Sequence, residues 1–381
     1  MRATWLWLVL VGLGCRGSAP GVSAAGERSC AHRRETEWLA FSPDSQHLVS
    51  TGADGLKVWA LDGRPEAIVS EEQTPKRGVF DERGHFVGAV EGGVFELTLA
   101  PPFARRFVAL ENFSRRLGAV IGGSRGGRVA WLQGDSLRVV DLDAPTQVIR
   151  HALPGVEASF TATAGDRLVI VSMARDRNAL AKVRVFDLGE PEVAPGVLAA
   201  GTSPRQPVLS ADGRLLAMHL DSQLVVFDLA SAKELWRARS SRNGLVPNGF
   251  SADGKWLFAG DDKFDQMTFD VFTGEERGRD PYVPGKQGMW IRTVSGPRAE
   301  GIFCREGDRL EIYDLDLKRI GTLGAPGQYG IQHVSRALEA SPDGKWVAVE
   351  HASRVHLWNL ETRQVTYLVD PAIKSQVPCT E

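Results

Sequence analysis

The chain has 381 residues, of which 45 are Lys or Arg and 47 are Asp or Glu, so its net charge is -2. This balance, with the basic residues scattered rather than pooled, excludes the electrostatic footprint of a nucleic-acid-binding protein. A hydrophobic content of 43% with 41 Gly and 20 Pro excludes a disordered chain and indicates a folded, turn-rich protein.

The N-terminal residues predict a signal for export. Arg2 supplies a positive charge, residues 5–13 form an apolar run, and small residues follow. The run is too short to span a bilayer. Its end, a small residue followed by Cys15, resembles the lipobox of bacterial lipoproteins, and this resemblance implies that Cys15 carries a lipid. Simple secretion, with cleavage after residue 24 or 25, is the alternative.

A repeated pattern of strands and turns then runs along the chain. Each copy has an apolar strand, a turn such as Ser-Pro-Asp-Gly, a second strand, a tight turn such as Asp54-Gly55, and a third strand that ends on a large apolar residue. The copies lie at 40–63, 79–97, 163–188, 209–229, 250–271 and 340–360, with weaker ones at 123–142 and 295–315.

The spacing of the copies predicts the architecture. The position of Trp59 recurs after 36, 45, 46, 41, 42, 44 and 45 residues, at Phe95, Val140, Phe186, Phe227, Phe269, Tyr313 and Trp358. An average of about 43 residues is typical of a four-stranded propeller blade. We therefore expect an all-β chain with a single β-propeller of eight four-stranded blades over residues 37–370. Seven blades are the alternative, if the weak copy around 115–145 packs irregularly.

The repeats resemble the WD40 family, most clearly at Trp59 in "VWAL" and Trp358 in "LWNL". The resemblance covers nearly all of residues 37–370 and implies a propeller fold. The Gly-His pair that the family places before the first strand is missing here. The Ser-His-Asp-Trp hydrogen-bond network of that family is therefore not expected.

The remaining segments flank the ring. They are a signal peptide at 1–14, a linker at 15–36 and a C-terminal tail at 371–381. Cys30 and Cys379 stand just outside the two ends of the propeller, which must meet, and an exported chain sees an oxidising compartment. They are predicted to form a disulfide; two free thiols are the alternative. Cys304 is expected as a buried apolar thiol in the second strand of the 295–315 copy.

No pattern predicts catalysis or a cofactor. Residues 122–126 fit G-x-S-x-G, but a strand follows them where a nucleophile elbow needs a helix. The acidic stretch 261–265 lacks the spacing of a calcium loop, and the sequence has no HExxH motif, P-loop or paired CxxC. We therefore predict no catalytic residue, no metal site and no cofactor.

Three long connectors remain as a candidate binding surface: 240–249, 279–290 and 324–336. They mix aromatic and charged residues, a composition enriched at protein interfaces, in Arg242, Tyr282, Lys286, Trp290, Tyr329 and His333. Packing between blades is the alternative for Trp290.

The predicted function is that of a non-catalytic protein–protein interaction module. It would be monomeric, would bind a protein or peptide, and would be held at the bacterial cell envelope by a lipid anchor or released to the periplasm or medium. The alternative is a propeller enzyme or small-molecule-binding protein with a site in the central channel, such as a lactonase-like hydrolase.

Overall fold

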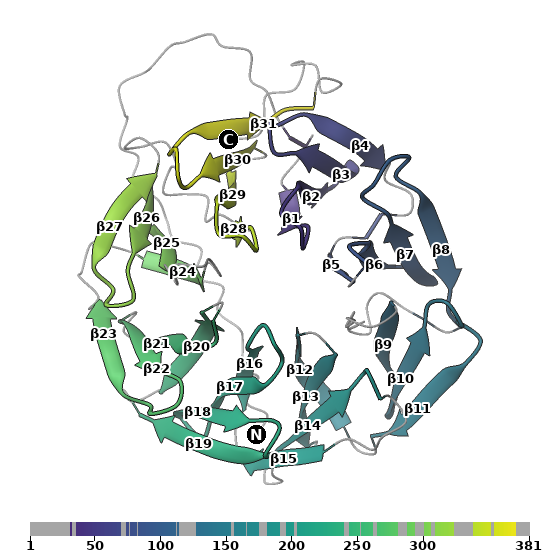
Figure 1. The fold of residues 1–381 in the computed structure, drawn as a ribbon. Coiled ribbons are helices and arrows are strands. Elements are labelled where there is room, and N and C mark those ends of the chain that lie inside the picture. The colour runs from purple at the N-terminus through teal and green to yellow at the C-terminus, as the bar shows by residue number, and fades with distance from the viewer. Residues whose placement is uncertain are drawn as a thin grey trace, which may run out of the picture.

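The computed structural model shows the chain as a closed ring of β-sheets (Figure 1). It describes residues 31–32, 36–69, 74–75, 77–81, 83–111, 113, 127–153, 156–164, 166–174, 181–190, 196–201, 204–239, 244–251, 253–261, 265–280, 288–293, 301–305, 309–323, 338–351 and 354–370. Over these ranges, no helix is long and apolar enough to cross a bilayer.

Seven antiparallel four-stranded sheets are the blades of the ring. In each blade the four strands pair in chain order. The first strand lies nearest the centre of the ring and the fourth at its rim (Figure 1). The predicted all-β, single β-propeller is confirmed.

The strand bounds follow, with blades numbered 1 to 7 along the chain. Blade 1 has β1 (Thr36–Phe41), β2 (His47–Gly52), β3 (Gly55–Ala60) and β4 (Pro65–Val69); blade 2 has β5 (Gly78–Phe80), β6 (Phe86–Val90), β7 (Gly93–Leu97) and β8 (Arg105–Ala109). Blade 3 has β12 (Val156–Ala164), β13 (Arg167–Ala174), β14 (Ala181–Asp187) and β15 (Gly196–Gly201); blade 4 has β16 (Arg205–Leu209), β17 (Leu215–Leu220), β18 (Gln223–Asp228) and β19 (Lys233–Ala238).

The last three blades complete the set. Blade 5 has β20 (Leu245–Phe250), β21 (Trp256–Asp261), β22 (Gln266–Asp270) and β23 (Glu276–Asp280); blade 6 has β24 (Gly288–Thr293), β25 (Gly301–Arg305), β26 (Arg309–Tyr313) and β27 (Arg319–Leu323); blade 7 has β28 (Leu338–Ala340), β29 (Trp346–His351), β30 (Arg354–Asn359) and β31 (Val365–Leu368).

One sheet departs from the pattern. Between blades 2 and 3, β9 (Arg128–Gln133), β10 (Ser136–Asp141) and β11 (Val148–Ala152) form a sheet of three described strands. This is the weak copy around 115–145, and residues 114–126 before it lie outside the described part of the chain. Seven four-stranded blades, the alternative that the sequence left open, are therefore what the described residues show, with this three-stranded sheet beside them in the ring.

A serine turn joins the first two strands of four blades. In blade 1 the Ser42 hydroxyl donates to Asp44 Oδ1 at 2.5 Å and accepts the backbone N–H of His47 at 2.9 Å. Each turn thus satisfies a backbone donor within its own residues. The same pair of bonds recurs at Ser210, Ser251 and Ser341.

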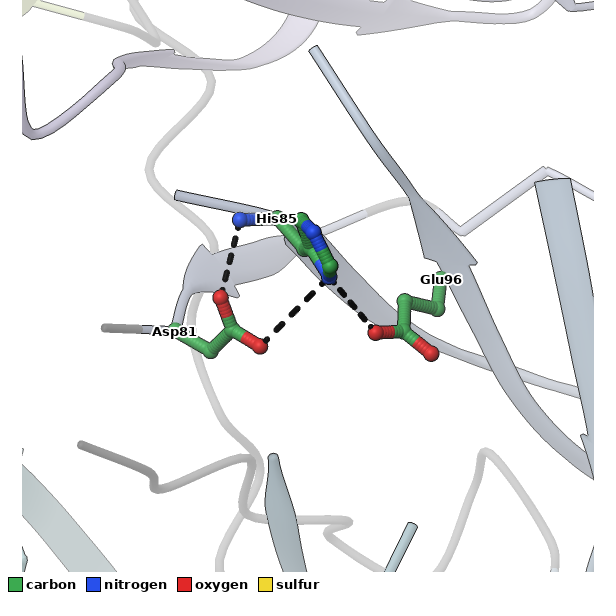
Figure 2. Close-up of side chains that lie close together, drawn as sticks. All are labelled: Asp81, His85 and Glu96. Atoms are coloured by element: carbon green, nitrogen blue, oxygen red, sulfur yellow. Dashed lines mark hydrogen bonds and ion pairs between the residues drawn. The ribbon is translucent and has the colours of Figure 1, made fainter. Parts of the chain in front are cut away.

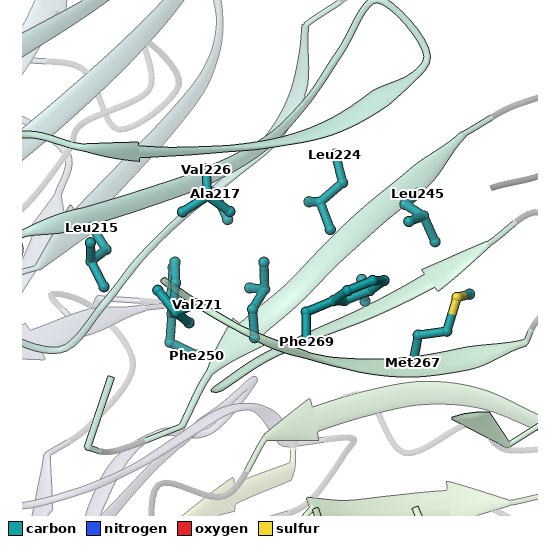
Figure 3. Close-up of a cluster of buried hydrophobic side chains, with 11 residues drawn as sticks. Leu215, Ala217, Leu224, Val226, Leu245, Phe250, Met267, Phe269 and Val271 are labelled. Atoms are coloured by element: carbon teal, nitrogen blue, oxygen red, sulfur yellow. The ribbon is translucent and has the colours of Figure 1, made fainter. Parts of the chain in front are cut away.

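The hydrophobic core is divided among the contacts between neighbouring sheets. Figure 3 shows one such contact, where side chains of blade 4 face those of blade 5. Leu224 and Val226 of β18 pack there with Met267 and Phe269 of β22, and all four are buried. Because each blade is apolar on both faces, a blade is covered only when the ring places a neighbour on either side.

The ring closes between blades 1 and 7, and we call this contact the closing seam. Each of the two blades is built from one end of the chain only. Their apolar cluster contains Trp59 and Leu39 from blade 1 with Leu357 and Leu368 from blade 7. The backbone N–H of Asp343 also donates to the Ser45 hydroxyl, at 3.1 Å. No strand crosses from one end blade to the other among the described residues, so side chains hold this seam.

In blade 2 the residue equivalent to Trp59 is not the one that the sequence pattern predicted. The register pairs Leu48 with Trp59 in blade 1 and Phe86 with Leu97 in blade 2, each pair directly after the first turn. Leu97 therefore occupies the Trp59 position, and Phe95, which the sequence pattern selected, lies two residues earlier on the same strand. The sequence pattern selected Phe95 because it is aromatic like Trp59. The equivalent position is set by backbone pairing and not by residue type, and that pairing selects Leu97.

The Ser-His-Asp-Trp hydrogen-bond network, which was not expected from the sequence, is present in blade 1. The Trp59 indole N–H donates to Ser50 Oγ at 2.7 Å, and Ser50 Oγ lies 2.7 Å from His32 Nε2. The Nδ1 atom of His32 lies 2.5 Å from Asp54 Oδ1. The expectation was wrong because it required a Gly before the histidine, whereas Ala31 precedes His32 and is accommodated fully buried.

Candidate functional site

The strongest cluster of chemically active side chains arises where blade 2 departs from the serine turn. Asp81 stands at the serine position, and Arg83 follows two residues later where other blades have Asp. Asp81 Oδ1 accepts the backbone N–H of His85 at 2.8 Å, and Arg83 Nε donates to Asp81 Oδ2 at 2.8 Å. The Asp81–Arg83 ion pair thus replaces the Ser–Asp hydrogen bond of the serine turns. The turn is also one residue shorter: the Asp81 N–H donates to the carbonyl four residues later, at His85, whereas the Ser42 N–H donates to the carbonyl five residues later, at His47.

This turn lies against a carboxylate of β7, as Figure 2 shows. The His85 Nδ1–H donates to Glu96 Oε1 at 2.8 Å, and the same nitrogen lies 3.8 Å from Asp81 Oδ2. Asp81 and Glu96 are buried, whereas His85 is partly exposed. We call Asp81, His85 and Glu96 the blade 2 triad.

The triad has the ligand types of a metal site. One atom from each residue can be chosen so that all lie within 4.8 Å of one another, and zinc is bound in proteins by imidazole nitrogen and carboxylate oxygen. However, Arg83 Nη2 lies 2.8 Å from Asp81 Oδ2 and 2.9 Å from Glu96 Oε1. The guanidinium thus takes the place that a cation would occupy between the two carboxylates, and a metal ion would have to displace it.

Arginine also links the triad to the three-stranded sheet. Arg106 of β8 donates to Glu96 Oε2 at 2.6 Å and, through two nitrogens, to Asp143 Oδ1 at 3.1 Å. Asp143 follows β10, and its other oxygen lies 3.3 Å from Arg83 Nη1. Two arginines and three carboxylates therefore bridge neighbouring sheets, with Asp143 exposed at the edge of the network.

The close fit of this network involves a glycine. A Cβ at Gly127, just before β9, would lie 2.6 Å from Arg83 Nη2, and its φ of +67° is one that L side chains rarely adopt. Burial of Arg83 acts to lower its pKa, but the bond to Asp81 and the charges of Glu96 and Asp143 raise it above the ordinary value. Arg83 therefore stays charged, and the arrangement is an ion-paired lock between two sheets rather than an acid–base pair.

Most residues that the sequence selected for function lie outside the described part of the chain. These are Cys15, Cys30, Cys379, Arg242, Tyr282, Lys286, Tyr329 and His333. Trp290 lies in β24, the first strand of blade 6. The surroundings of its side chain lie outside the described part of the structure, so both partner binding and packing between blades stay predictions. Cys304 lies in β25, the second strand of the same blade, as predicted.

Sequence reasoning did not select the triad, although a signal was present. Residues 81–85 replace the Ser-x-Asp turn of the other copies by Asp-x-Arg-x-His. A departure from a repeat that adds three ionisable residues marks a position with a different partner. Glu96 could not have been added, because its contact with the turn depends on the register of β6 against β7.

Comparison with known proteins adds little to this description. No protein-family model matches the chain, and no curated protein matches it. Among solved structures, a chain from "Crystal Structure of Mitotic Checkpoint Complex" is similar at 12% identity and a TM-score of 0.49, covering 77% of this chain and 97% of that one. At this level nothing about binding or activity is carried from one protein to the other.

Proposed function

We propose that this chain is a non-catalytic protein–protein interaction module whose partner binds at the rim of the propeller, beside the closing seam. The triad supports a structural use of its charges, since each carboxylate has an arginine partner. The support for binding comes from the outer strands.

The observation that carries the proposal is a row of exposed apolar side chains at one register position. Ile68 pairs with Lys57, Phe107 with Phe95, and Tyr367 with His356. In each blade the inner partner stands two residues before the Trp59 position, so the three outer residues are equivalent. Ile68 is 48% exposed, Phe107 45% and Tyr367 48%. We call these three residues the rim patch.

The rim patch covers consecutive blades. Tyr367 belongs to blade 7, Ile68 to blade 1 and Phe107 to blade 2, which follow one another around the ring (Figure 1). The equivalent residue is arginine in the three-stranded sheet and in blades 4 and 5, namely Arg150, Arg237 and Arg279. Large apolar and aromatic side chains gathered on one side of a ring are typical of a protein-binding surface.

We further propose that the chain is exported and anchored through a lipid on Cys15. The support is in the sequence: a positive charge, an apolar run over residues 5–13 and a cysteine after small residues. A Cys15→Ser variant should move from the membrane fraction to the soluble fraction of its native cells. If it stays with the membrane, the anchor proposal is wrong.

The binding proposal is tested by crosslinking in native cells. The full chain, tagged after Glu381, is crosslinked and purified, and its stoichiometric partners are identified by mass spectrometry. The triple variant Ile68→Ser, Phe107→Ser, Tyr367→Ser should reduce partner recovery at least about tenfold, because interface hot spots are large side chains in the centre of the contact.

A matched control is available in blade 3. Val197 pairs with Arg184 at the equivalent register position and is 60% exposed, but it stands away from the rim patch. Val197→Ser should leave recovery unchanged. Loss of the partner in both variants would overturn the rim patch as the binding surface. Recovery of the unmodified chain without any partner would overturn binding to a protein and favour a small ligand in the central channel.

A further inference from the structure

A buried lysine lies where the two ends of the propeller meet. Lys57 of β3 has a side chain that is 1% exposed. Its Nζ donates to the backbone carbonyl of Ala31 at 2.6 Å and to Asp54 Oδ2 at 2.9 Å. It also lies 2.8 Å from Asp370 Oδ2. An ammonium group has three donors, and all three are engaged here.

These three acceptors come from parts of the chain that are far apart in sequence. Ala31 precedes the first strand of blade 1, and Asp370 follows the last strand of blade 7. Both are buried. One ammonium group therefore joins the segment that enters the ring to the segment that leaves it.

From this we infer that Lys57 is an electrostatic clasp that holds the closing seam shut, and that acid releases it. The clasp consists of Lys57, Asp54, Asp370 and His32. His32 belongs to it because its Nδ1 lies 2.5 Å from Asp54 Oδ1, the other oxygen of the carboxylate that holds Lys57.

The sign of the pH dependence follows from the two groups whose pKa is displaced. Burial, the largest influence, lowers the pKa of His32 below its ordinary 6.5, although Asp54 acts in the other direction. Burial acts to raise the pKa of Asp54, but the bonds from His32 and Lys57 outweigh it and hold that pKa far below its ordinary 3.8. The charged groups that act on His32 are Asp54, Lys57 and Asp370.

Both displacements favour opening in acid. When the seam opens, His32 regains its ordinary pKa and takes up a proton at any pH below about 6.5, and Asp54 does the same below about 3.8. The closed state binds fewer protons than the open state, so it loses stability as pH falls through these values. The stability of a seam held by apolar contacts alone would not depend on pH in this way.

The ring supplies an internal comparison. The contact between blades 4 and 5 in Figure 3 joins blades that are consecutive in the chain, and between β18 and β22 it consists of apolar side chains. His219 of β17 is titratable, and its Nδ1 lies 2.9 Å from the Leu245 carbonyl oxygen of β20, so those two strands are left out of the comparison. Hydrogen exchange of the full chain, corrected for intrinsic rates, is measured by mass spectrometry at pH 7, 6 and 5. Peptides of β1 and β31 report on the closing seam, and peptides of β18 and β22 on the apolar contact.

We expect exchange at the closing seam, relative to the apolar contact, to rise roughly tenfold from pH 7 to pH 5. This is the size of effect expected when His32 takes up one proton as the seam opens. Asp370→Asn should raise seam exchange at pH 7 at least about tenfold, since it removes a charge from a buried ion pair. His32→Gln should abolish the rise between pH 7 and pH 5.

The control variant is Asp187→Asn. Asp187 forms an ion pair of similar length, 2.9 Å from Arg167 Nη1, but this pair is partly exposed and lies within blade 3. This variant should leave the seam unchanged. The clasp is overturned if the two contacts respond to pH in parallel, or if Asp370→Asn and Asp187→Asn have the same effect on the seam. The pH series on the unmodified chain decides the question even where a variant fails to fold.

Discussion

At the scale of single residues, buried polar side chains are stabilised by having each donor matched to one acceptor. Neutral His32, whose pKa burial lowers, has one ring proton. Because Asp54 can only accept, that proton is on Nδ1, and Nε2 accepts from the Ser50 hydroxyl. The hydroxyl oxygen in turn accepts from Trp59. A single hydroxyl thus satisfies two buried rings at once.

Ser50→Ala should therefore be costly. It leaves the Trp59 N–H and His32 Nε2 buried without a partner, at about 1–3 kcal/mol for each group. We expect the free energy of unfolding in urea to fall by about 3 kcal/mol. Ser231→Ala is the control, because Ser231 is exposed and uses its backbone N–H, 3.1 Å from Asp228 Oδ1. Equal losses in the two variants would contradict the role of the Ser50 hydroxyl.

At the scale of elements, the turn between the first two strands of a blade is built by two different chemistries, and it is one residue shorter in blade 2. In blades 1, 4, 5 and 7 a serine and an aspartate close the turn with neutral and charge-assisted hydrogen bonds. In blade 2 an aspartate and an arginine close it and extend to β7, β8 and the three-stranded sheet. The ion-paired turn adds charged contacts between blade 2 and the three-stranded sheet, which also share an apolar cluster.

Glu96→Gln tests this lock. Glu96 is buried and accepts from Arg83, His85 and Arg106. Removing one member of a fully buried ion pair costs about 3–5 kcal/mol. Because Arg83 and Arg106 are 35% and 43% exposed and water can solvate them, we expect a smaller loss, about 1–3 kcal/mol, in urea unfolding. Glu66→Gln is the control, since Glu66 is exposed in β4 and lies 3.1 Å from His47 Nε2. A loss below 1 kcal/mol for Glu96→Gln would show that the network does not stabilise the fold.

At the scale of the whole molecule, the ring must be closed by side chains, because each end blade is made from one end of the chain. The closing seam combines an apolar cluster with the Lys57 clasp, which fixes Ala31 and Asp370 to the same ammonium group. Cys30 is the residue before Ala31, and Cys379 follows Asp370 by nine residues. Nine extended residues can span roughly 30 Å, which is enough to bring Cys379 back to the neighbourhood of Ala31.

The disulfide between Cys30 and Cys379 therefore stays a prediction, and what supports it is that Ala31 and Asp370 contact the same ammonium group. Non-reducing peptide mapping of protein from its native compartment should find the two cysteines linked. Cys30→Ser should then lower the free energy of unfolding, by up to roughly 5 kcal/mol, because the link closes nearly the whole chain. Cys304→Ser, in β25, is the control for loss of a thiol. Two unlinked thiols in the native protein would contradict the prediction.

The repeat made the fold predictable from the sequence, whereas the sites depended on contacts between copies. Trp59 and Trp358 marked their blades correctly, and the serine turns fell where Ser-Pro-Asp and Ser-Ala-Asp stood. Leu97 was missed in favour of Phe95. The network through His32 was not expected, because the Gly-His pair of the WD40 family is missing before the first strand. The rim patch was not foreseen, since Ile68, Phe107 and Tyr367 follow no common motif along the chain.

The sequence by itself determined the class of fold, because a strand pattern repeated about every 43 residues requires neighbours on both faces of each sheet and hence a ring. It also determined the turns, which form from residues three to five positions apart. Only the tertiary structure decided the partners of Lys57 and Glu96 and the exposed position of Ile68 on the rim. Each partner lies on another strand, turn or end of the chain, and burial and ion pairing depend on which groups the closed ring brings within a few ångströms.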